Sequence, residues 1–362
     1  MNKKGYLVLE DGGVFEGERF GADGETLGEL VFATGMVGYI ETMTDPSYYG
    51  QIVLQTFPLI GNYGFIPEDR ESGRTVLRGY VVREWCREPS NFRAQGDVDA
   101  YLRAQGVPGL SGVDTREITK RIREQGVMNA YITDDLSKVN FEALRSYRVV
   151  DAVAAVSEAG TRIFPAEGEE RYRVALLDYG TKGHIVKNLQ KRGCAVTVLP
   201  YDATAAEILS LGLDGLMLSN GPGDPAENTG CVAVLRELLG KLPIFGICLG
   251  HQLLAMAAGG RTEKLKYGHR GGNQPVRRLG DGRLFITSQN HGYAVVPESV
   301  PEEAGRMSFE NVSDGTCEGM EYPGLTAFSV QFHPEACAGP HDAEFLFDEF
   351  LAMMEAQRHA QR

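Results

Sequence analysis

The chain has 362 residues, of which 43% are hydrophobic and 23% charged, with a formal net charge of −13 at pH 7. This length favours two domains, and the composition is ordinary for a soluble globular protein. The acidic balance argues against binding nucleic-acid phosphates or an anionic membrane surface. Six cysteines occur without a C-x-x-C or metal-type spacing, so we expect no disulfide framework, no zinc site and a reducing, cytoplasmic location. We also expect no signal peptide and no membrane span.

Residues 1–150 predict a smaller, β-rich α/β domain. A hairpin is expected where residues 6–10 and 14–17 flank Asp11-Gly12-Gly13. Apolar runs predict further strands at residues 30–35, 51–55 and 76–82. Helices, each followed by a glycine, are expected at residues 97–105 and 114–125. The polar stretch 151–171 that follows is predicted to be a linker.

Strands and helices alternate through a second predicted domain, residues 172–358. The expected strands are 174–178, 195–199, 215–219 and 243–247. The helices that follow them are expected at 185–192, 204–211, 232–239 and 249–257. This α/β alternation is typical of a doubly wound, mostly parallel sheet, whose ligands lie at the carboxyl ends of the strands. Later strands are expected at 283–296 and 325–332, and a closing amphipathic helix at 341–357.

Cys248 lies where an apolar strand is expected to turn sharply into a helix. Gly246 and Gly250 stand two residues away on either side, as a strained nucleophile elbow requires. A helix N-terminus also favours a thiolate, because its free N–H groups and dipole stabilise negative charge. The ordinary alternative is a buried core cysteine, but the Gly-x-Cys-x-Gly pattern favours a nucleophile.

Two other polar segments follow predicted strands. His333 and Glu335 are two residues apart, so on an extended chain they face the same way, as a base and its orienting carboxylate must. Gly221 and Gly223, in Asn-Gly-Pro-Gly-Asp-Pro, could bring backbone N–H groups to an oxyanion. Each segment alone would ordinarily be a turn, but together with the cysteine they predict one site at one sheet edge. As the base, His333 is favoured over the other two candidates, His251 and His291.

These motifs carry a resemblance. Gly-Ile-Cys-Leu-Gly-His-Gln, Asn-Gly-Pro-Gly-Asp-Pro and Phe-His-Pro-Glu resemble the triad-type, class I glutamine amidotransferases. Further segments are similar to the small subunit of glutamine-dependent carbamoyl-phosphate synthetase: Asp45-Pro46-Ser47-Tyr48, Gly61-Asn62-Tyr63-Gly64, Gly112-Val113-Asp114-Thr115-Arg116, Asp178-Tyr179-Gly180-Thr181-Lys182 and Ser288-Gln289-Asn290-His291-Gly292. The resemblance covers essentially the whole chain and implies a class I amidotransferase fold for residues 172–358.

The resemblance implies L-glutamine as the substrate. Cys248 would form a glutamyl thioester, His333 would move the protons and Glu335 would hold the imidazole, with the Leu249 and Gly223 N–H groups as oxyanion donors. The implied glutamine contacts are Ser47, Gly221, Gly223, Leu249, Gln252, Asn290, Gly292 and Tyr293. Ser47 would reach the site from the first domain.

A phosphate-binding loop, a dinucleotide fingerprint and a metal-ligand motif are all missing from the sequence. The resemblance therefore implies no cofactor or metal in this chain, and a separate large subunit that uses ATP, bicarbonate and a divalent metal. That subunit would receive ammonia through a channel and make carbamoyl phosphate for arginine or pyrimidine synthesis. The alternatives are the glutaminase subunit of another amidotransferase, such as that of anthranilate or aminodeoxychorismate synthesis, a stand-alone γ-glutamyl peptidase, and a non-catalytic regulatory subunit.

Overall fold

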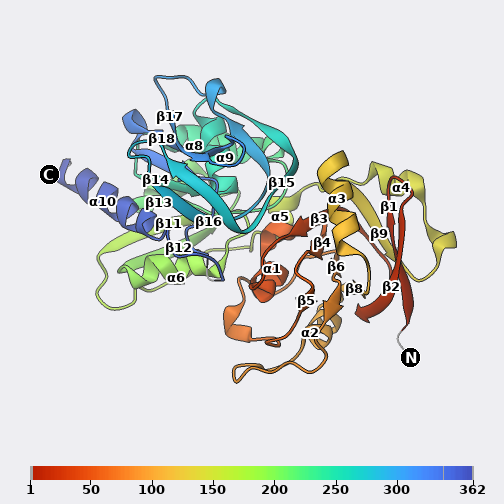
Figure 1. Ribbon diagram of the computed structural model, residues 1–362. Helices are drawn as coiled ribbons and strands as arrows, with labels where there is room; N and C mark the ends of the chain where they lie inside the picture. Colours follow the sequence, from red (N-terminus) through yellow and green to blue (C-terminus); the bar gives the residue numbers. More distant parts are fainter. Residues whose placement is uncertain (1–2, 337, 361–362) are drawn as a thin grey trace. The chain divides into compact units, whose positions relative to one another are not determined.

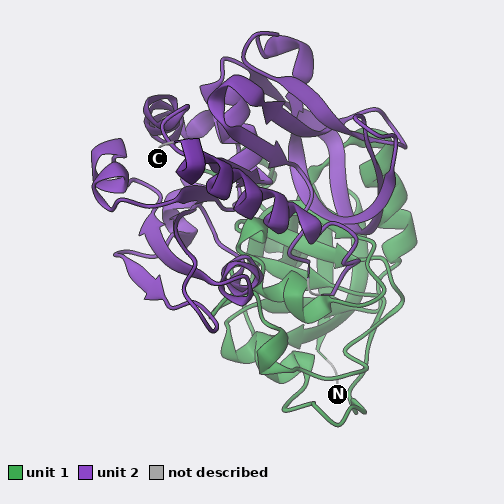
Figure 2. Ribbon diagram, turned by 90° about the vertical axis from the view of Figure 1, so that its left-hand side faces the viewer, with its two compact units in different colours: residues 1–150 green, residues 151–362 purple. Residues whose placement is uncertain are grey.

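The computed structural model describes residues 3–336 and 338–360. The chain divides into two compact units, unit 1 at residues 1–150 and unit 2 at residues 151–362 (Figure 2). Within the described ranges, no helix is both long enough and apolar enough to span a bilayer.

Unit 1 is built on a closed β-barrel. Its strands are β1 (Lys4–Leu9), β2 (Val14–Gly21), β3 (Thr26–Ala33), β4 (Gln51–Gln55), β6 (Gly79–Val81), β8 (Pro108–Ser111) and β9 (Met128–Thr133). They follow the order β1-β2-β8-β6-β4-β3-β9, and β9 pairs with β1 to close the barrel (Figure 1). The predicted β1–β2 hairpin is confirmed. Two short strands, β5 (Leu59–Ile60) and β7 (Glu84–Trp85), pair separately.

The helices of unit 1 are α1 (Tyr39–Thr44), α2 (Val98–Ala104), α3 (Thr115–Gln125) and α4 (Phe141–Ser146). The two predicted helices, α2 and α3, are confirmed, and aspartates at their N-caps explain where they begin. Asp97 accepts a hydrogen bond from the Ala100 N–H at 2.8 Å, and Asp114 accepts one from the Glu117 N–H at 2.9 Å.

Unit 2 contains one large mixed sheet. Its strands are β10 (Arg162–Phe164), β11 (Tyr172–Asp178), β12 (Cys194–Pro200), β13 (Gly215–Leu218), β14 (Ile244–Ile247), β15 (Arg261–Arg278), β16 (Leu284–Val296), β17 (Arg306–Asn311), β18 (Cys317–Tyr322) and β19 (Ala327–Val330). The order is β10-β12-β11-β13-β14-β19-β18-β17-β15-β16. The strands from β12 to β19 in this order pair in parallel. The remaining pairs are antiparallel: β10 pairs with β12 at one edge, and β18, β17, β15 and β16 extend the sheet beyond β19. Of this extension, the sequence predicted the strand at 283–296, which is β16, but not β15, β17 or β18.

Helices cover both faces of the parallel part of this sheet. They are α6 (Gly183–Lys191), α7 (Ala205–Ser210), α8 (Thr229–Leu238), α9 (Leu249–Ala257) and α10 (Phe345–Ala360). Alternate strand residues point to opposite faces: Leu177 and Leu216 share a core with α7, α8 and α9, whereas Leu176 and Met217 share a core with α6 and α10. Burial on both faces explains the continuous apolar runs, and the predicted α/β class is confirmed.

Residues 151–171 differ from the predicted linker because they belong to unit 2. Helix α5 (Ala152–Val156) contributes Val153 to the core, and β10 pairs antiparallel with β12. The sequence suggested a linker because polar residues and glycines surround these two short elements. Their order comes from contacts with distant parts of the chain, which a local pattern does not report.

Candidate active site

Cys248 lies between β14 and α9 with φ 53° and ψ −104°, a strained backbone for a residue other than glycine. The flanking glycines make the turn possible. A Cβ on Gly246 would lie 2.8 Å from the carbonyl oxygen of Gly250, and one on Gly250 would lie 2.6 Å from the Cβ and carbonyl oxygen of Leu218. The Cys248 N–H donates to the Val330 carbonyl at 2.9 Å. The predicted strand, sharp turn and helix are confirmed, and the geometry is that of a nucleophile elbow.

His333 and Glu335 form a fully buried pair just after β19. The Nδ1–H of His333 donates to Oε1 of Glu335 at 2.7 Å, and both side chains are 0% exposed. The His333 N–H donates to the Ser288 carbonyl at 2.9 Å, which fixes this segment against β16. Within the described ranges, His333 Nε2 has no hydrogen-bond partner. The imidazole therefore has one nitrogen held by a carboxylate and the other free for proton transfer.

The charges in this pair follow from its surroundings. Burial and the Lys182 ammonium lower the pKa of His333, but Glu335 and the Cys248 thiol outweigh them and raise that pKa to about 10. Burial raises the pKa of Glu335, whereas His333 and Lys182 lower it, and the net direction is down. The surroundings therefore favour the imidazolium–carboxylate form of the pair, which makes His333 a good acceptor for the proton of the neighbouring Cys248 thiol.

The sequence reasoning assigned no role to Lys182, yet it belongs to this site. Lys182 is buried after β11, and its Nζ lies 3.7 Å from Oε1 of Glu335. Its backbone N–H donates to Oδ1 of Asn220 at 3.0 Å, which links it to the Gly221–Gly223 segment. The available signal was its position: it follows a parallel strand, as the predicted site residues do.

The predicted site segments gather because their strands are parallel neighbours. Asn220, Cys248 and His333 follow β13, β14 and β19, whose carboxyl ends meet at one edge of the sheet. Gly223 has φ +89° in the turn after β13. Leu249 is the first residue of α9, where helix N–H groups lack an acceptor within the helix. The geometry is compatible with oxyanion donors at these two positions.

Most of the predicted glutamine contacts lie around Cys248 in unit 2. The Cys248 thiol donates to the Asn290 carbonyl at 3.7 Å, and the Gln252 amide donates to the Tyr293 carbonyl at 2.8 Å. Asn290, Gly292 and Tyr293 are therefore held beside the elbow by β16. Ser47 lies in unit 1, in the 3-10 turn η1 (Pro46–Tyr48), and its N–H donates to Oδ1 of Asp45 at 2.8 Å. Its contact with glutamine stays a prediction.

The two other candidate bases are neutral histidines in structural roles. Burial lowers the pKa of His251 to about 3, and its Nδ1 lies 2.8 Å from Oγ of Ser329. Burial, followed by the nearby His269, lowers the pKa of His291 well below its ordinary value. Neither is held by a carboxylate as His333 is, which supports the preference for His333.

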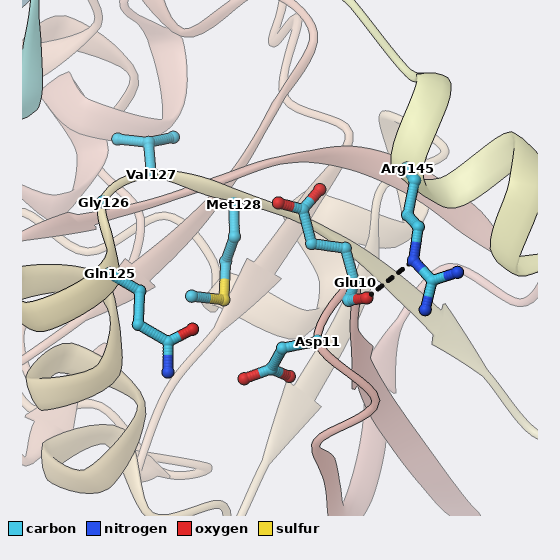
Figure 3. A pocket seen from close by; sticks show the side chains of 7 residues that line it. All are labelled: Glu10, Asp11, Gln125, Gly126, Val127, Met128 and Arg145. Atoms are coloured by element: carbon cyan, nitrogen blue, oxygen red, sulfur yellow. Dashed lines mark hydrogen bonds between the residues drawn. The ribbon is translucent and has the colours of Figure 1, made fainter.

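A different hollow lies in unit 1 and contains none of the predicted site residues. It is a cavity of about 300 Å³ lined by Glu10, Asp11, Gln125, Gly126, Val127, Met128 and Arg145 (Figure 3). Nε of Arg145 donates to the Glu10 carbonyl at 3.2 Å across its rim. The catalytic geometry is therefore that of the sheet edge in unit 2, not that of this cavity.

Comparisons with known proteins agree with this division of the chain. Residues 175–353 match the family of class-I glutamine amidotransferases, and residues 7–132 match the CPSase domain of the carbamoyl-phosphate synthase small chain. Unit 2 thus contains the amidotransferase domain.

Three relatives fix the family. Proteins named carbamoyl phosphate synthase small chain are 49% identical in Bacillus caldolyticus, over 97% of this chain and 96% of theirs, and 50% identical in Clostridium perfringens, over 96% and 99%. A pyrimidine-specific small chain from Halalkalibacterium halodurans is 47% identical over 98% of both chains. The chain belongs to the carbamoyl phosphate synthase small chain family.

Proposed function

We propose that this subunit hydrolyses L-glutamine at Cys248, with His333 as proton carrier and Glu335 as its orienting carboxylate. The ammonia released passes to a separate large subunit. One observation carries the proposal: a cysteine on a strained elbow adjoins a buried imidazole whose far nitrogen donates to a buried carboxylate at 2.7 Å.

The reaction divides into two steps. The Cys248 thiol passes its proton to His333 as its sulfur attacks the side-chain carboxamide carbon, and the tetrahedral oxygen is stabilised by the N–H groups of Leu249 and Gly223. The C–N bond then breaks, and His333 gives its proton to the departing ammonia, which leaves a glutamyl thioester. Water attacks the thioester while His333 takes up its proton, the C–S bond breaks, and His333 returns the proton to the departing sulfur, which releases glutamate and restores the free thiol. This hydrolysis needs no cofactor.

The remaining glutamine contacts follow from where the chain holds each residue. Asn290, Gly292 and Tyr293 come from β16, Gln252 comes from α9, and Gly221 comes from the turn after β13. Gln252 uses its amide to fix both the Tyr293 carbonyl and, at 2.9 Å, Oε1 of Gln331. We propose Ser47 of unit 1 as a further glutamine contact, on the resemblance of Asp45-Pro46-Ser47-Tyr48 alone.

The partner follows from the family. We propose that a large subunit receives the ammonia through an internal channel, and that it supplies the ATP, bicarbonate and divalent-metal chemistry that makes carbamoyl phosphate for arginine or pyrimidine synthesis. One relative is named pyrimidine-specific and the other two carry no pathway in their names. The five cysteines of the described ranges are free thiols, which supports a reducing cytoplasmic location.

The test is glutamate release from L-glutamine by the native chain, Cys248→Ser and Cys231→Ser, each with and without a bacterial large subunit. Cys231 is a matched control because it is a buried free thiol outside the site. We expect slow release by the native chain, a large increase with the partner, ATP and bicarbonate, and loss only in Cys248→Ser. Rapid hydrolysis that ignores the partner would favour a stand-alone peptidase, and activity in Cys248→Ser would remove this site from consideration.

A further inference from the structure

Three buried side chains outside the proposed triad converge on one point in unit 2. His269 comes from β15, His291 from β16 and Glu318 from β18, and one potential ligand atom from each lies within 4.8 Å of the other two. His269 and His291 are 8% and 5% exposed, and Glu318 is 0% exposed. We propose that His269, His291 and Glu318 form a structural Zn²⁺ site.

The hydrogen bond of His269 to Asp314 orients the ring so that Nδ1 faces Glu318. Its Nε2–H donates to Oδ2 of Asp314 at 2.8 Å, so whenever the ring is neutral its lone pair lies on the opposite nitrogen, Nδ1. Nδ1 lies 3.4 Å from Oε1 of Glu318 in a geometry that makes no hydrogen bond. A histidine that ligates a metal commonly donates its other N–H to a carboxylate in this way.

His291 likewise has an oxygen close to each of its ring nitrogens. Its Nδ1 lies 2.8 Å from the Tyr293 carbonyl oxygen and its Nε2 lies 3.2 Å from Oε1 of Gln289, and a neutral ring has only one N–H to donate to these two oxygens. The Gln289 amide is oriented by Thr287: the Thr287 hydroxyl donates to the Gln274 carbonyl, so it accepts from the Gln289 NH₂ group at 3.1 Å. The Gln289 oxygen, rather than its NH₂ group, therefore faces Nε2 of His291. At least one ring nitrogen of neutral His291 thus has its lone pair directed at an oxygen.

The carboxylate of Glu318 brings a negative charge close to the nitrogen atoms of His269 and His291. Oε1 of Glu318 accepts from the Asn311 amide at 2.9 Å, but Oε2 has no hydrogen-bond partner within the described ranges. A fully buried carboxylate that faces lone pairs is costly unless a cation neutralises it. A proton on Nδ1 of His269 would serve only the contact with Oε1 of Glu318 and would leave Oε2 of Glu318 without a partner. A second proton on His291 is disfavoured because the two rings lie 5.0 Å apart and like charges would repel.

The spacing suits a tetrahedral ion. Zn²⁺ ligands at about 2.0–2.1 Å stand about 3.3 Å apart at tetrahedral angles. The 3.4 Å from Nδ1 of His269 to Oε1 of Glu318 matches this spacing, and the ligand atom of His291 lies within 4.8 Å of the other two. Two imidazoles and oxygen donors suit Zn²⁺ better than Mg²⁺ or Ca²⁺. No metal motif is recognisable in the sequence, because these residues come from three separate strands rather than from one short spacing.

The test measures metal directly, so its outcome is independent of glutaminase activity. Untagged native protein is freed of metal by a chelator, titrated with Zn²⁺ against a chromophoric chelator, and analysed by elemental mass spectrometry. Glu318→Gln keeps the side-chain shape and removes the charge, and Glu321→Gln is the control, because it lies on the same strand but is partly exposed and paired with Arg306. We expect one Zn²⁺ per chain in the native protein and in Glu321→Gln, and at least tenfold weaker binding in Glu318→Gln.

A Co²⁺ spectrum covers the case in which Glu318→Gln does not fold. We expect native protein to give the intense visible bands of a four-coordinate ion, and to keep them in Cys248→Ser, which excludes the active-site thiol as a ligand. The proposal is overturned if native protein takes up no stoichiometric Zn²⁺ or Co²⁺, or if Glu318→Gln binds them as tightly. In either case the cluster is a proton-linked ion pair between His269, Asp314 and Glu318.

Discussion

Replacing Glu335 with glutamine is the sharpest perturbation of the proposed triad, because it keeps the side-chain size and removes the charge. The lost hydrogen bond joins two fully buried groups at 2.7 Å. A hydrogen bond to a charged group contributes about 1.5–3 kcal/mol. Since about 1.4 kcal/mol corresponds to a tenfold change in rate, loss of this bond alone lowers kcat about 12- to 140-fold. Loss of the correct tautomer would extend the decrease towards about 10⁴-fold.

The same substitution also has a pH signature. Without Glu335, burial and Lys182 still lower the pKa of His333, so the imidazolium loses its proton at lower pH than in the native protein. We therefore expect the alkaline limb of the kcat/KM profile for glutamate release to move to lower pH. Glu71→Gln, which alters a buried carboxylate of unit 1, is the control and should leave the profile unchanged. A Glu335→Gln protein that is folded by thermal unfolding, yet has native kcat and an unmoved alkaline limb, would refute the reasoning.

Three further predictions concern the elbow and the imidazole. Gly250→Ala should lower the free energy of unfolding in urea by about 1–3 kcal/mol, because its Cβ would lie 2.6 Å from Leu218. Gly230→Ala is the control and should not destabilise the chain, because no atom lies within 4 Å of the added Cβ. Equal stabilities of the two variants would contradict the packing argument. The pKa of His333 rises from 6.5 to about 10, so its stabilisation is fully present below pH 6.5 and is lost as the pH rises through about 10. The stability difference between native and His333→Asn should shrink over that range, and a constant difference would count against the ion pair. His333→Asn should also slow iodoacetamide alkylation of Cys248, as mapped by mass spectrometry, because the thiolate loses its cation; an unchanged rate would separate the two residues.

Elements with a strong local pattern could be predicted from the sequence. The strand–elbow–helix around Cys248 was predictable because an apolar run, paired glycines and a helical pattern adjoin one another. The helices that begin after Asp97 and Asp114 were predictable from their caps and terminating glycines. The clustering of Cys248 and His333 also followed, because residues after parallel strands meet at one edge.

Features that depend on distant pairing were not predictable in this way. Strand β15 is mostly polar and glycine-rich, and its burial is irregular with two register shifts against β16, so it carries no clean alternation. The edge strand β10 has three residues and is ordered by its pairing with β12. The position of Lys182 after a parallel strand placed it near the site, but its contact with Glu335 was not predictable, because 152 residues of chain separate the two.

The most direct test of the account is to trap the thioester. Native protein is mixed with L-glutamine and the large subunit, quenched in acid during turnover, digested and analysed by mass spectrometry, with Cys248→Ser and Cys231→Ser in parallel. The account predicts a glutamyl adduct on the peptide that carries Cys248 in the native protein and in Cys231→Ser, and none on any cysteine in Cys248→Ser. Turnover without an adduct at Cys248, or an adduct on another cysteine, would contradict the assignment of Cys248 as the nucleophile.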